Sequence, residues 1–237
     1  MKRMLVVENS KENHKIMESM PIFESGSNTY IRSKQADPLT ALFSHHTNIQ
    51  KFKKKQVIYQ EGNHPLQLFL IKKGIVKTFK CNGEGKELIT GIYGEGEYLG
   101  YVAMLENTAY KDIAVAVEYA ELAIVPKDAF EELMETDWQI ARKFITLLAK
   151  DIADREQLLL GLAYNSLRKK VAEALILLSR KYKDAIKISR DNLAAIAGTA
   201  TESLIRTLGE FRQEKLIEIS EGYITIVNEA KLRTMLN

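Results

Sequence analysis

The sequence predicts an α+β protein with a β-rich N-terminal part and a helical C-terminal part, and three observations lead to this prediction. Between Leu39 and Val125 short apolar runs recur with glycines beside them, at the roughly 8–12-residue spacing that is typical of β-sandwiches and barrels. After Asp128 glycines become rare, and apolar residues repeat with the period of an α-helix. A length of 237 residues is long for one compact domain and suits two.

The β-rich region is expected to form one domain over residues 39–135. Its apolar runs are rich in β-branched residues and occupy residues 56–59, 68–71, 75–79, 88–92 and 114–117. Residues of these types fit a pleated, half-buried surface. Residues 1–38 mix Ser, Asn and Lys with few large apolar side chains, so we expect an N-terminal extension there.

A long helix is predicted over residues 136–163. Its apolar positions step by four and three along one stripe: Ala141, Ile145, Leu148, Ile152, Arg155 (the polar exception), Leu159 and Leu162. The stripe can pack against the β-domain of the same chain or against a partner helix. Its length of about four heptads is more than a small β-domain covers, which favours self-association across a two-fold axis. An ordinary intramolecular core helix stays open as the alternative.

Residues 164–237 predict a winged helix-turn-helix. Helices are expected over 167–182, 190–197 and 200–214, with Ser189 as an N-cap and Gly198 in the turn between the last two. Two helices joined by a turn of about three residues containing glycine are typical of this motif. Two short strands follow over 217–219 and 223–226, and they predict a β-hairpin, the wing.

Composition excludes several classes of protein. An apolar fraction of 46% with 27% charged residues is ordinary for a soluble globular protein, and no run approaches the ~20 apolar residues of a membrane span. A single cysteine, Cys81, allows neither an internal disulfide nor an all-cysteine metal cluster. The N-terminus makes a poor signal peptide, so we expect a cytoplasmic protein without a bound metal or cofactor. No phosphate loop, nucleophile elbow or metal-ligand spacing indicates an enzyme.

Charge points towards nucleic acid in the C-terminal part. The formal net charge of the chain is only +3. From Tyr164 onward, 13 Lys and Arg face 9 Asp and Glu, a difference of +4, so the last third carries the excess.

Several stretches resemble one family of bacterial transcription regulators, the Crp/Fnr family. Residues 188–206, followed by Leu208-Gly209-Glu210-Phe211 and Lys215-Leu216-Ile217, look like its helix-turn-helix. Residues 59–62, 69–77 and 96–100 resemble its cyclic-nucleotide-binding-type jelly roll, a double-stranded β-helix. The resemblance runs from Leu39 to the C-terminus. It implies a homodimer, joined through the 136–163 helix, that binds a palindromic double-stranded operator and RNA polymerase.

The resemblance assigns roles on the second helix of the motif. Arg206 falls where the family places an arginine that reads guanine, and a guanidinium can donate two hydrogen bonds to guanine O6 and N7. Glu202, one turn away, falls where a carboxylate accepts from cytosine or orients that arginine. Thr201 stands where some members carry a second arginine, so we expect a different site preference. Phosphate contacts are expected from Ser189, Arg190 and Thr199. Without the surrounding motif, Glu202 and Arg206 read as a surface ion pair.

The predicted effector pocket departs from the cyclic-AMP pattern. Members that bind cyclic AMP carry a glutamate and an Arg-Ser pair after a Gly-x-x-x-Gly region, and this chain has Tyr101, Lys111 and Asp112 there, next to Gly100. An aspartate repels a phosphodiester, and a lysine lacks the fork of an arginine. Arg155 faces the pocket or pairs with acids across the dimer seam. We therefore expect a small-molecule effector other than cyclic AMP.

One cysteine cannot hold the iron–sulfur cluster of other members. A ligand-binding signalling module whose helix-turn-helix serves protein contacts remains the alternative function.

Overall fold

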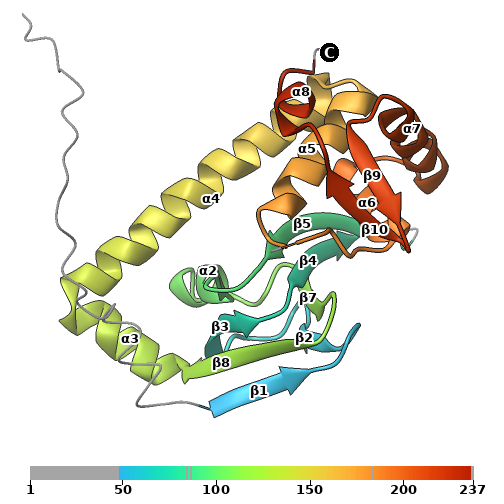
Figure 1. Ribbon diagram of the computed structural model, residues 1–237. Coiled ribbons are helices and arrows are strands. Elements are labelled where there is room, and N and C mark those ends of the chain that lie inside the picture. The colour runs from blue at the N-terminus through green and yellow to red at the C-terminus, as the bar shows by residue number, and fades with distance from the viewer. Residues whose placement is uncertain (1–47, 84, 86, 183, 236–237) are drawn as a thin grey trace, which may run out of the picture. The chain divides into compact units, whose positions relative to one another are not determined.

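The computed structural model describes residues 48–83, 85, 87–182 and 184–235. The predicted N-terminal extension, residues 1–38, and residues 39–47 of the predicted β-domain lie outside this range. Along the described chain a β-domain, a long helix and a helical domain with a hairpin follow one another in the predicted order, so the predicted fold class is confirmed (Figure 1).

The β-domain, here called the β-roll, consists of two four-stranded antiparallel sheets within the described residues. The first sheet has the order β1 (Asn48–Phe52), β8 (Ala120–Pro126), β3 (Gln67–Lys73) and β6 (Tyr98–Leu99). The second has the order β2 (Val57–Tyr59), β7 (Ile113–Ala116), β4 (Val76–Cys81) and β5 (Glu87–Tyr93). Apolar side chains of both sheets pack together, among them Phe69, Ile71, Val76, Ala114 and Leu122. The two sheets therefore share one interior.

Glycine is required at the turn between β3 and β4. Gly74 has a φ of +87°, and a Cβ placed there would lie 2.3 Å from the carbonyl oxygen of Tyr119. Any side chain would collide with the backbone at the start of β8, so the turn depends on glycine.

Helix α2 (Tyr101–Leu105) lies between β6 and β7 in the chain, and helices α3 (Lys127–Thr136) and α4 (Trp138–Tyr164) follow β8 (Figure 1). The predicted 136–163 helix begins at Trp138 because Asp137 interrupts the helical run. The Asp137 carboxylate accepts a hydrogen bond from the Gln139 backbone N–H at 2.8 Å and so caps α4. The separate helix α3 was not predicted.

Helix α4 buries little of its own surface. Ile140 and Phe144 are buried, and the Phe144 ring packs edge-on against Phe130 of α3 with centroids 4.8 Å apart. The predicted stripe lies elsewhere on the helix: Ile145, Ile152 and Leu159 are 54–67% exposed. The described part of the chain therefore leaves these three residues of the stripe uncovered, whereas Leu148 packs partly against the apolar cluster around Phe144. An intramolecular core helix would have covered the stripe along its whole length.

The winged-helix domain comprises residues 167–233. Its elements are α5 (Leu167–Ser179), α6 (Arg190–Ala197), α7 (Thr201–Gln213), β9 (Ile217–Ser220), β10 (Tyr223–Ile226) and α8 (Glu229–Arg233). Helix α6 has the predicted ends, and the predicted 167–182 helix ends earlier, at Ser179. Buried Leu175, Leu193, Leu208 and Phe211 form the core of this domain. The predicted helices and wing are therefore present.

Candidate DNA-binding surface and β-roll interior

The turn between α6 and α7 brings the two helices of the motif together. Gly198 takes a φ of +61°, and its N–H bonds to the carbonyl oxygen of Ala194, which closes α6. The chain then enters α7 after two residues. A left-handed turn residue is needed here, as the sequence indicated.

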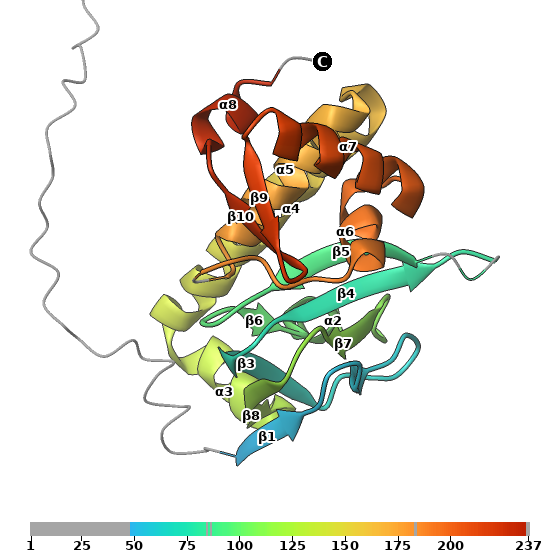
Figure 2. The same cartoon turned by 45° about the vertical axis from the view of Figure 1, so that its right-hand side comes forward.

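Helix α7 divides cleanly into a buried and an exposed face. Leu204, Leu208 and Phe211 are buried in the domain core, whereas Glu202 and Arg206 point away from it and are exposed. The three views agree that α7 lies on the side of the domain away from strands β4 and β5 (Figure 2). Glu202 and Arg206, four residues apart, therefore share one accessible face of the helix.

Thr201, the third predicted base-reading residue, has a partner within the domain. Its hydroxyl donates a hydrogen bond to a carboxylate oxygen of Asp191 on α6 at 3.0 Å. The contact joins the first turns of the two helices. Sequence spacing did not indicate it, because it depends on the crossing of α6 and α7.

The three predicted phosphate contacts lie at the N-terminal ends of α6 and α7. Ser189 caps α6, and its hydroxyl accepts from the N–H of Asn192 at 3.3 Å. One terminal nitrogen of Arg190 is 3.5 Å from the carbonyl oxygen of Gly222 in the wing turn, and the other is buried without a hydrogen-bond partner among the described residues. Thr199 sits in the turn before α7. Backbone N–H groups at helix N-termini favour anions such as phosphate.

A polar cluster occupies the interior of the β-roll. The Asp112 carboxylate accepts hydrogen bonds from the hydroxyl of Tyr59 at 3.1 Å and from the hydroxyl of Thr90 at 3.2 Å. Thr90 is also 2.9 Å from the hydroxyl of Thr78. The Tyr59 ring stacks on Tyr110 with centroids 3.8 Å apart. Strands β2, β4 and β5 and the segment before β7 therefore all contribute to this interior cluster.

Helix α4 contributes a second carboxylate next to this cluster. Asp151 accepts a hydrogen bond from the Tyr101 hydroxyl at 2.6 Å. Burial raises the pKa of Tyr93 to about 12, and the guanidinium of Arg155 acts in the opposite direction on the same phenol. Burial likewise raises the pKa of Tyr101, again against the effect of Arg155. Arg155 of α4 thus opposes the effect of burial on both phenols.

The structure brings together some of the predicted pocket residues and separates one. Gly100 precedes α2 with a φ of +89°, and a Cβ there would lie 3.4 Å from the Tyr110 hydroxyl. Lys111 points outward instead: its side chain is 60% exposed and its ammonium forms an ion pair with Glu106 at 2.7 Å. Lys111 therefore takes no part in the interior cluster: in the bend before β7, Lys111 faces Glu106 while its neighbour Asp112 faces Tyr59.

Sequence reasoning missed Tyr59, Thr90, Tyr110 and Asp151 as members of this cluster. Tyr59 and Thr90 bond to Asp112, 53 and 22 residues away, and Asp151 bonds to Tyr101, 50 residues away. The alternation of side chains along each strand was the only local signal that could have found the strand residues.

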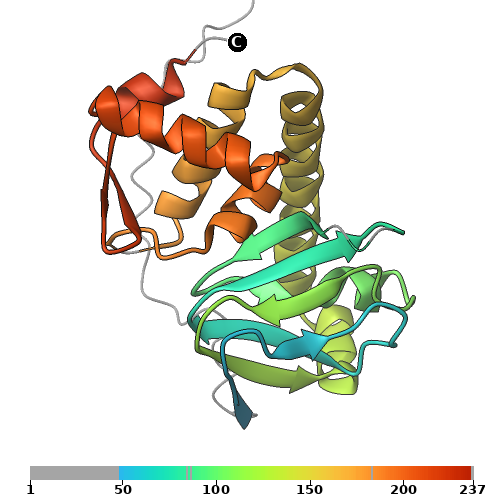
Figure 3. The ribbon, with the colours of Figure 1, turned by 90° about the vertical axis from the view of Figure 1, so that its right-hand side faces the viewer.

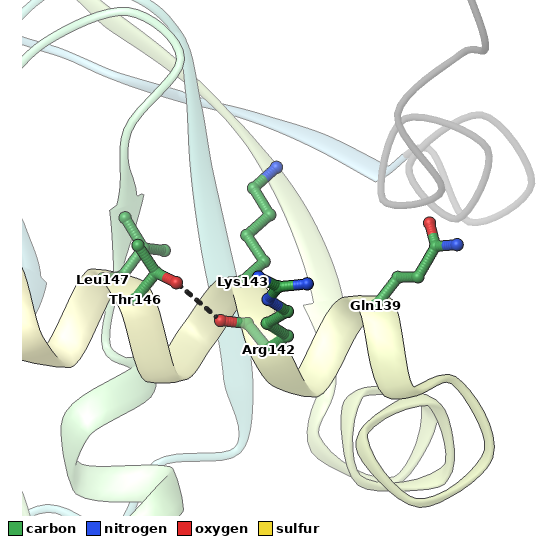
Figure 4. Close-up of a pocket in the computed structure, with 5 residues that line it drawn as sticks. All are labelled: Gln139, Arg142, Lys143, Thr146 and Leu147. Atoms are coloured by element: carbon green, nitrogen blue, oxygen red, sulfur yellow. Dashed lines mark hydrogen bonds between the residues drawn. The ribbon is translucent and has the colours of Figure 1, made fainter. Parts of the chain in front are cut away.

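A hollow of about 320 Å³ lies beside the N-terminal half of α4, lined by Gln139, Arg142, Lys143, Thr146 and Leu147 (Figure 4). The Thr146 hydroxyl bonds back to the carbonyl oxygen of Arg142 at 2.9 Å. All five residues belong to one helix, and none was predicted as a site residue.

The described residues contain no cluster of three or more His, Cys, Asp or Glu side chains arranged to hold a metal ion. None of their helices is long and apolar enough to cross a membrane.

Comparison with protein families matches two parts of the chain. Residues 49–137 match the model of the cyclic nucleotide-binding domain, and residues 169–235 match that of the Crp-like helix-turn-helix domain. The first match covers the β-roll and α3, and the second covers nearly all of the winged-helix domain.

Similar proteins are regulators by name. The transcriptional activator protein anr of Pseudomonas aeruginosa is 26% identical over 76% of this chain and 77% of its own length. The Cyclic AMP receptor protein of Thermus thermophilus is 28% identical over 74% of this chain and 82% of its own. The fold is similar to that of FixK2 from Bradyrhizobium japonicum, with a TM-score of 0.72 and 20% identity over 79% of this chain and 96% of that chain.

Proposed function

Because this chain belongs to the Crp/Fnr family of transcription regulators, we propose that it binds a palindromic DNA operator as a homodimer, controlled by an effector other than cyclic AMP. The observation that carries the proposal is the exposed pair Glu202 and Arg206 on the free face of α7. A major groove admits one helix, and this pair would read a G·C pair there, with phosphates held by Ser189, Arg190 and Thr199.

The homodimer would form through the apolar stripe of α4. Ile145, Ile152 and Leu159 are exposed in one chain, and burying them against the same stripe of a second copy would remove them from water. A two-fold axis along this helix pair presents two α7 helices to one side of a duplex. The half-sites are then expected about one helical turn apart, roughly 34–36 Å.

The effector would bind in or beside the interior cluster of the β-roll. The carboxylate of Asp112 already accepts hydrogen bonds from Tyr59 and Thr90, and a cyclic phosphodiester placed there would meet a like charge. Isothermal titration calorimetry should detect no cyclic-AMP binding to the full chain. The T. thermophilus Cyclic AMP receptor protein, titrated alongside it, would be the positive control. Micromolar binding by this chain would contradict the proposal on the effector.

The decisive experiment is selection of bound DNA from a random duplex pool, with and without a cell metabolite extract. We expect a palindromic sequence to be enriched, with affinity that falls steeply as salt rises because phosphate contacts release counterions. A change in affinity with the extract would support an effector. Enrichment of no sequence at all would favour the alternative, a ligand-binding signalling module whose helix-turn-helix contacts protein.

RNA polymerase is the expected protein partner of such a regulator, in the cytoplasm, where the DNA lies. Transcription in vitro from a promoter that carries the selected site would test this partner. It would also distinguish activation from repression. A transcript level that does not respond to the protein would contradict the assignment of RNA polymerase as a partner.

A further inference from the structure

Strand β4 is buried on both faces, which is unusual for a strand in a two-layer roll. Val76 packs into the interior of the β-roll, and Thr78 bonds to Thr90 of the interior cluster. The alternate residues Ile75 and Phe79 belong instead to an apolar cluster shared with the winged-helix domain. The second face of β4 is therefore covered by the DNA-binding part of the same chain (Figure 3).

Lys77 lies on this covered face and is 7% exposed. Its ammonium donates to a carboxylate oxygen of Glu87 on β5 and to the side-chain oxygen of Asn192 at 2.9 Å. The same ammonium lies 4.6 Å from the centre of the Phe79 ring. Asn192 is in the first turn of α6, the first helix of the helix-turn-helix. Lys77 thus joins the β-roll directly to the DNA-binding motif.

A second ion pair holds the same two domains together. Lys181, just after α5, forms an ion pair with Glu97 of the β-roll, and Glu97 also accepts from the Gly94 N–H at 2.7 Å. These residues line a cleft of about 770 Å³ between the domains. The winged-helix domain also contacts α4: a Cβ placed at Gly198 would lie 2.5 Å from the side chain of Leu162.

The apolar contacts of this interface hold the two domains together, whereas the polar contacts select their relative orientation. Apolar contacts are non-directional, so they hold two surfaces together without choosing one register. A buried hydrogen bond contributes little net stability, since desolvation offsets it, but every register that breaks it leaves a buried donor and acceptor unsatisfied. Lys77 keeps its ion pair with Glu87 inside the β-roll in any register. Rotating α6 on β5 would instead break its hydrogen bond to the Asn192 side-chain oxygen.

We infer that Lys77 is a positioning residue: through Asn192 it fixes the orientation of the winged-helix domain on the β-roll, and so the half-site spacing that the dimer accepts. The inference rests on the proposed function. In a dimer joined through α4, the separation of the two α7 helices depends on the orientation of each winged-helix domain relative to the β-roll of its own chain. Removing the contact that fixes this orientation should let the dimer accept several half-site spacings, while the preferred half-site sequence stays unchanged.

The test is selection from a pool in which two copies of the preferred half-site are separated by varied spacers. The full chain should enrich one spacing. Lys77→Met should enrich several with the same half-site, and its preference for the native spacing over one shifted by a base pair should fall by about tenfold. Lys80→Met, which removes an exposed lysine of the same strand, should behave like the unchanged protein.

A second variant separates positioning from misfolding. Asn192→Ala removes the same hydrogen bond from the other partner, so it should also enrich several half-site spacings. The double variant with Lys77→Met should enrich no wider range of spacings than either single variant, because both substitutions remove one shared contact. Thermal unfolding of each variant reports whether it folds. Retention of a single spacing by folded Lys77→Met or by Asn192→Ala would overturn the inference and leave the proposed function standing. Failure of the unchanged protein to enrich any palindrome would overturn both.

Discussion

Arg168 on α5 and Glu210 on α7 form an ion pair of 2.6 Å that ties the C-terminal half of α7 to the rest of the winged-helix domain. The same guanidinium bonds to Glu214 at 2.7 Å and lies 4.9 Å from the Phe211 ring. Arg168 thus holds the C-terminal end of α7 through two acids and an aromatic ring located there. The N-terminal half, with Glu202 and Arg206, stays free for a ligand.

Arg168→Met should therefore destabilise the winged-helix domain, but only by about 1 kcal/mol, because the pairs are partly exposed. Arg168→Lys should recover part of this loss, since it keeps the charge and loses the fork. Urea unfolding monitored by circular dichroism measures both. Lys169→Met, which removes a neighbouring charge on α5, is the control. Equal losses of unfolding free energy from Arg168→Met and Lys169→Met would show that the contacts of Arg168 with α7 contribute nothing specific to stability.

Arg206→Ala should weaken binding to the selected operator by ~1–3 kcal/mol and leave binding to unrelated DNA almost unchanged, because base contacts carry specificity. Fluorescence anisotropy with both duplexes at one salt concentration gives the comparison. Arg212→Ala, in the last turn of the same helix, should leave this discrimination intact. A similar loss on both duplexes would assign Arg206 to phosphate rather than to a base.

Ile152→Glu should dissociate the dimer, because Ile152 is 67% exposed on the free stripe of α4. Burying an isoleucine is worth roughly 1.5–3 kcal/mol, and two-fold symmetry doubles the loss, so the dissociation constant should rise by about 10²-fold or more. Analytical ultracentrifugation measures it. Gln157→Glu adds an acid to another exposed face of α4 and should leave the dimer intact, and an unchanged Ile152→Glu dimer would exclude the stripe as the interface.

The stability of the protein should fall between about pH 10 and 12 in a way that depends on Tyr110. Burial raises the pKa of this phenol to about 12, so the unfolded chain, with a pKa near 10, loses the proton first. The stability that Tyr110 contributes is complete below about pH 10, and above it declines by up to about 1.4 kcal/mol per pH unit.

Tyr110→Phe removes this contribution, so its unfolding free energy should depend less steeply on alkaline pH than that of the unchanged protein. Urea unfolding at pH 9, 10 and 11 measures the slopes. Tyr164→Phe, at a position 73% exposed, is the matched control. Parallel slopes for all three proteins would show that Tyr110 does not couple to folding.

Local signals explain which elements were predictable. Helix α6 was predicted with both its ends because Ser189 caps one and Gly198 closes the other, and both signals lie next to the helix they bound. The long helix was predicted to begin within two residues of its observed start at Trp138, whereas helix α3 directly before it was not predicted. Glu202 and Arg206 could be placed on one face of α7 from their spacing alone, since a helix repeats within four residues.

The amino-acid sequence by itself determined the order of β-roll, long helix and winged helix-turn-helix, together with the residues on the exposed face of α7. These features depend on periodicity and on capping residues within a few positions of one another. Only the tertiary structure decided what surrounds Asp112, which side Lys111 faces, and that Lys77 of a β-strand is covered by α6. Such contacts join residues up to 115 positions apart, and their partners are chosen by strand register and domain packing rather than by local pattern.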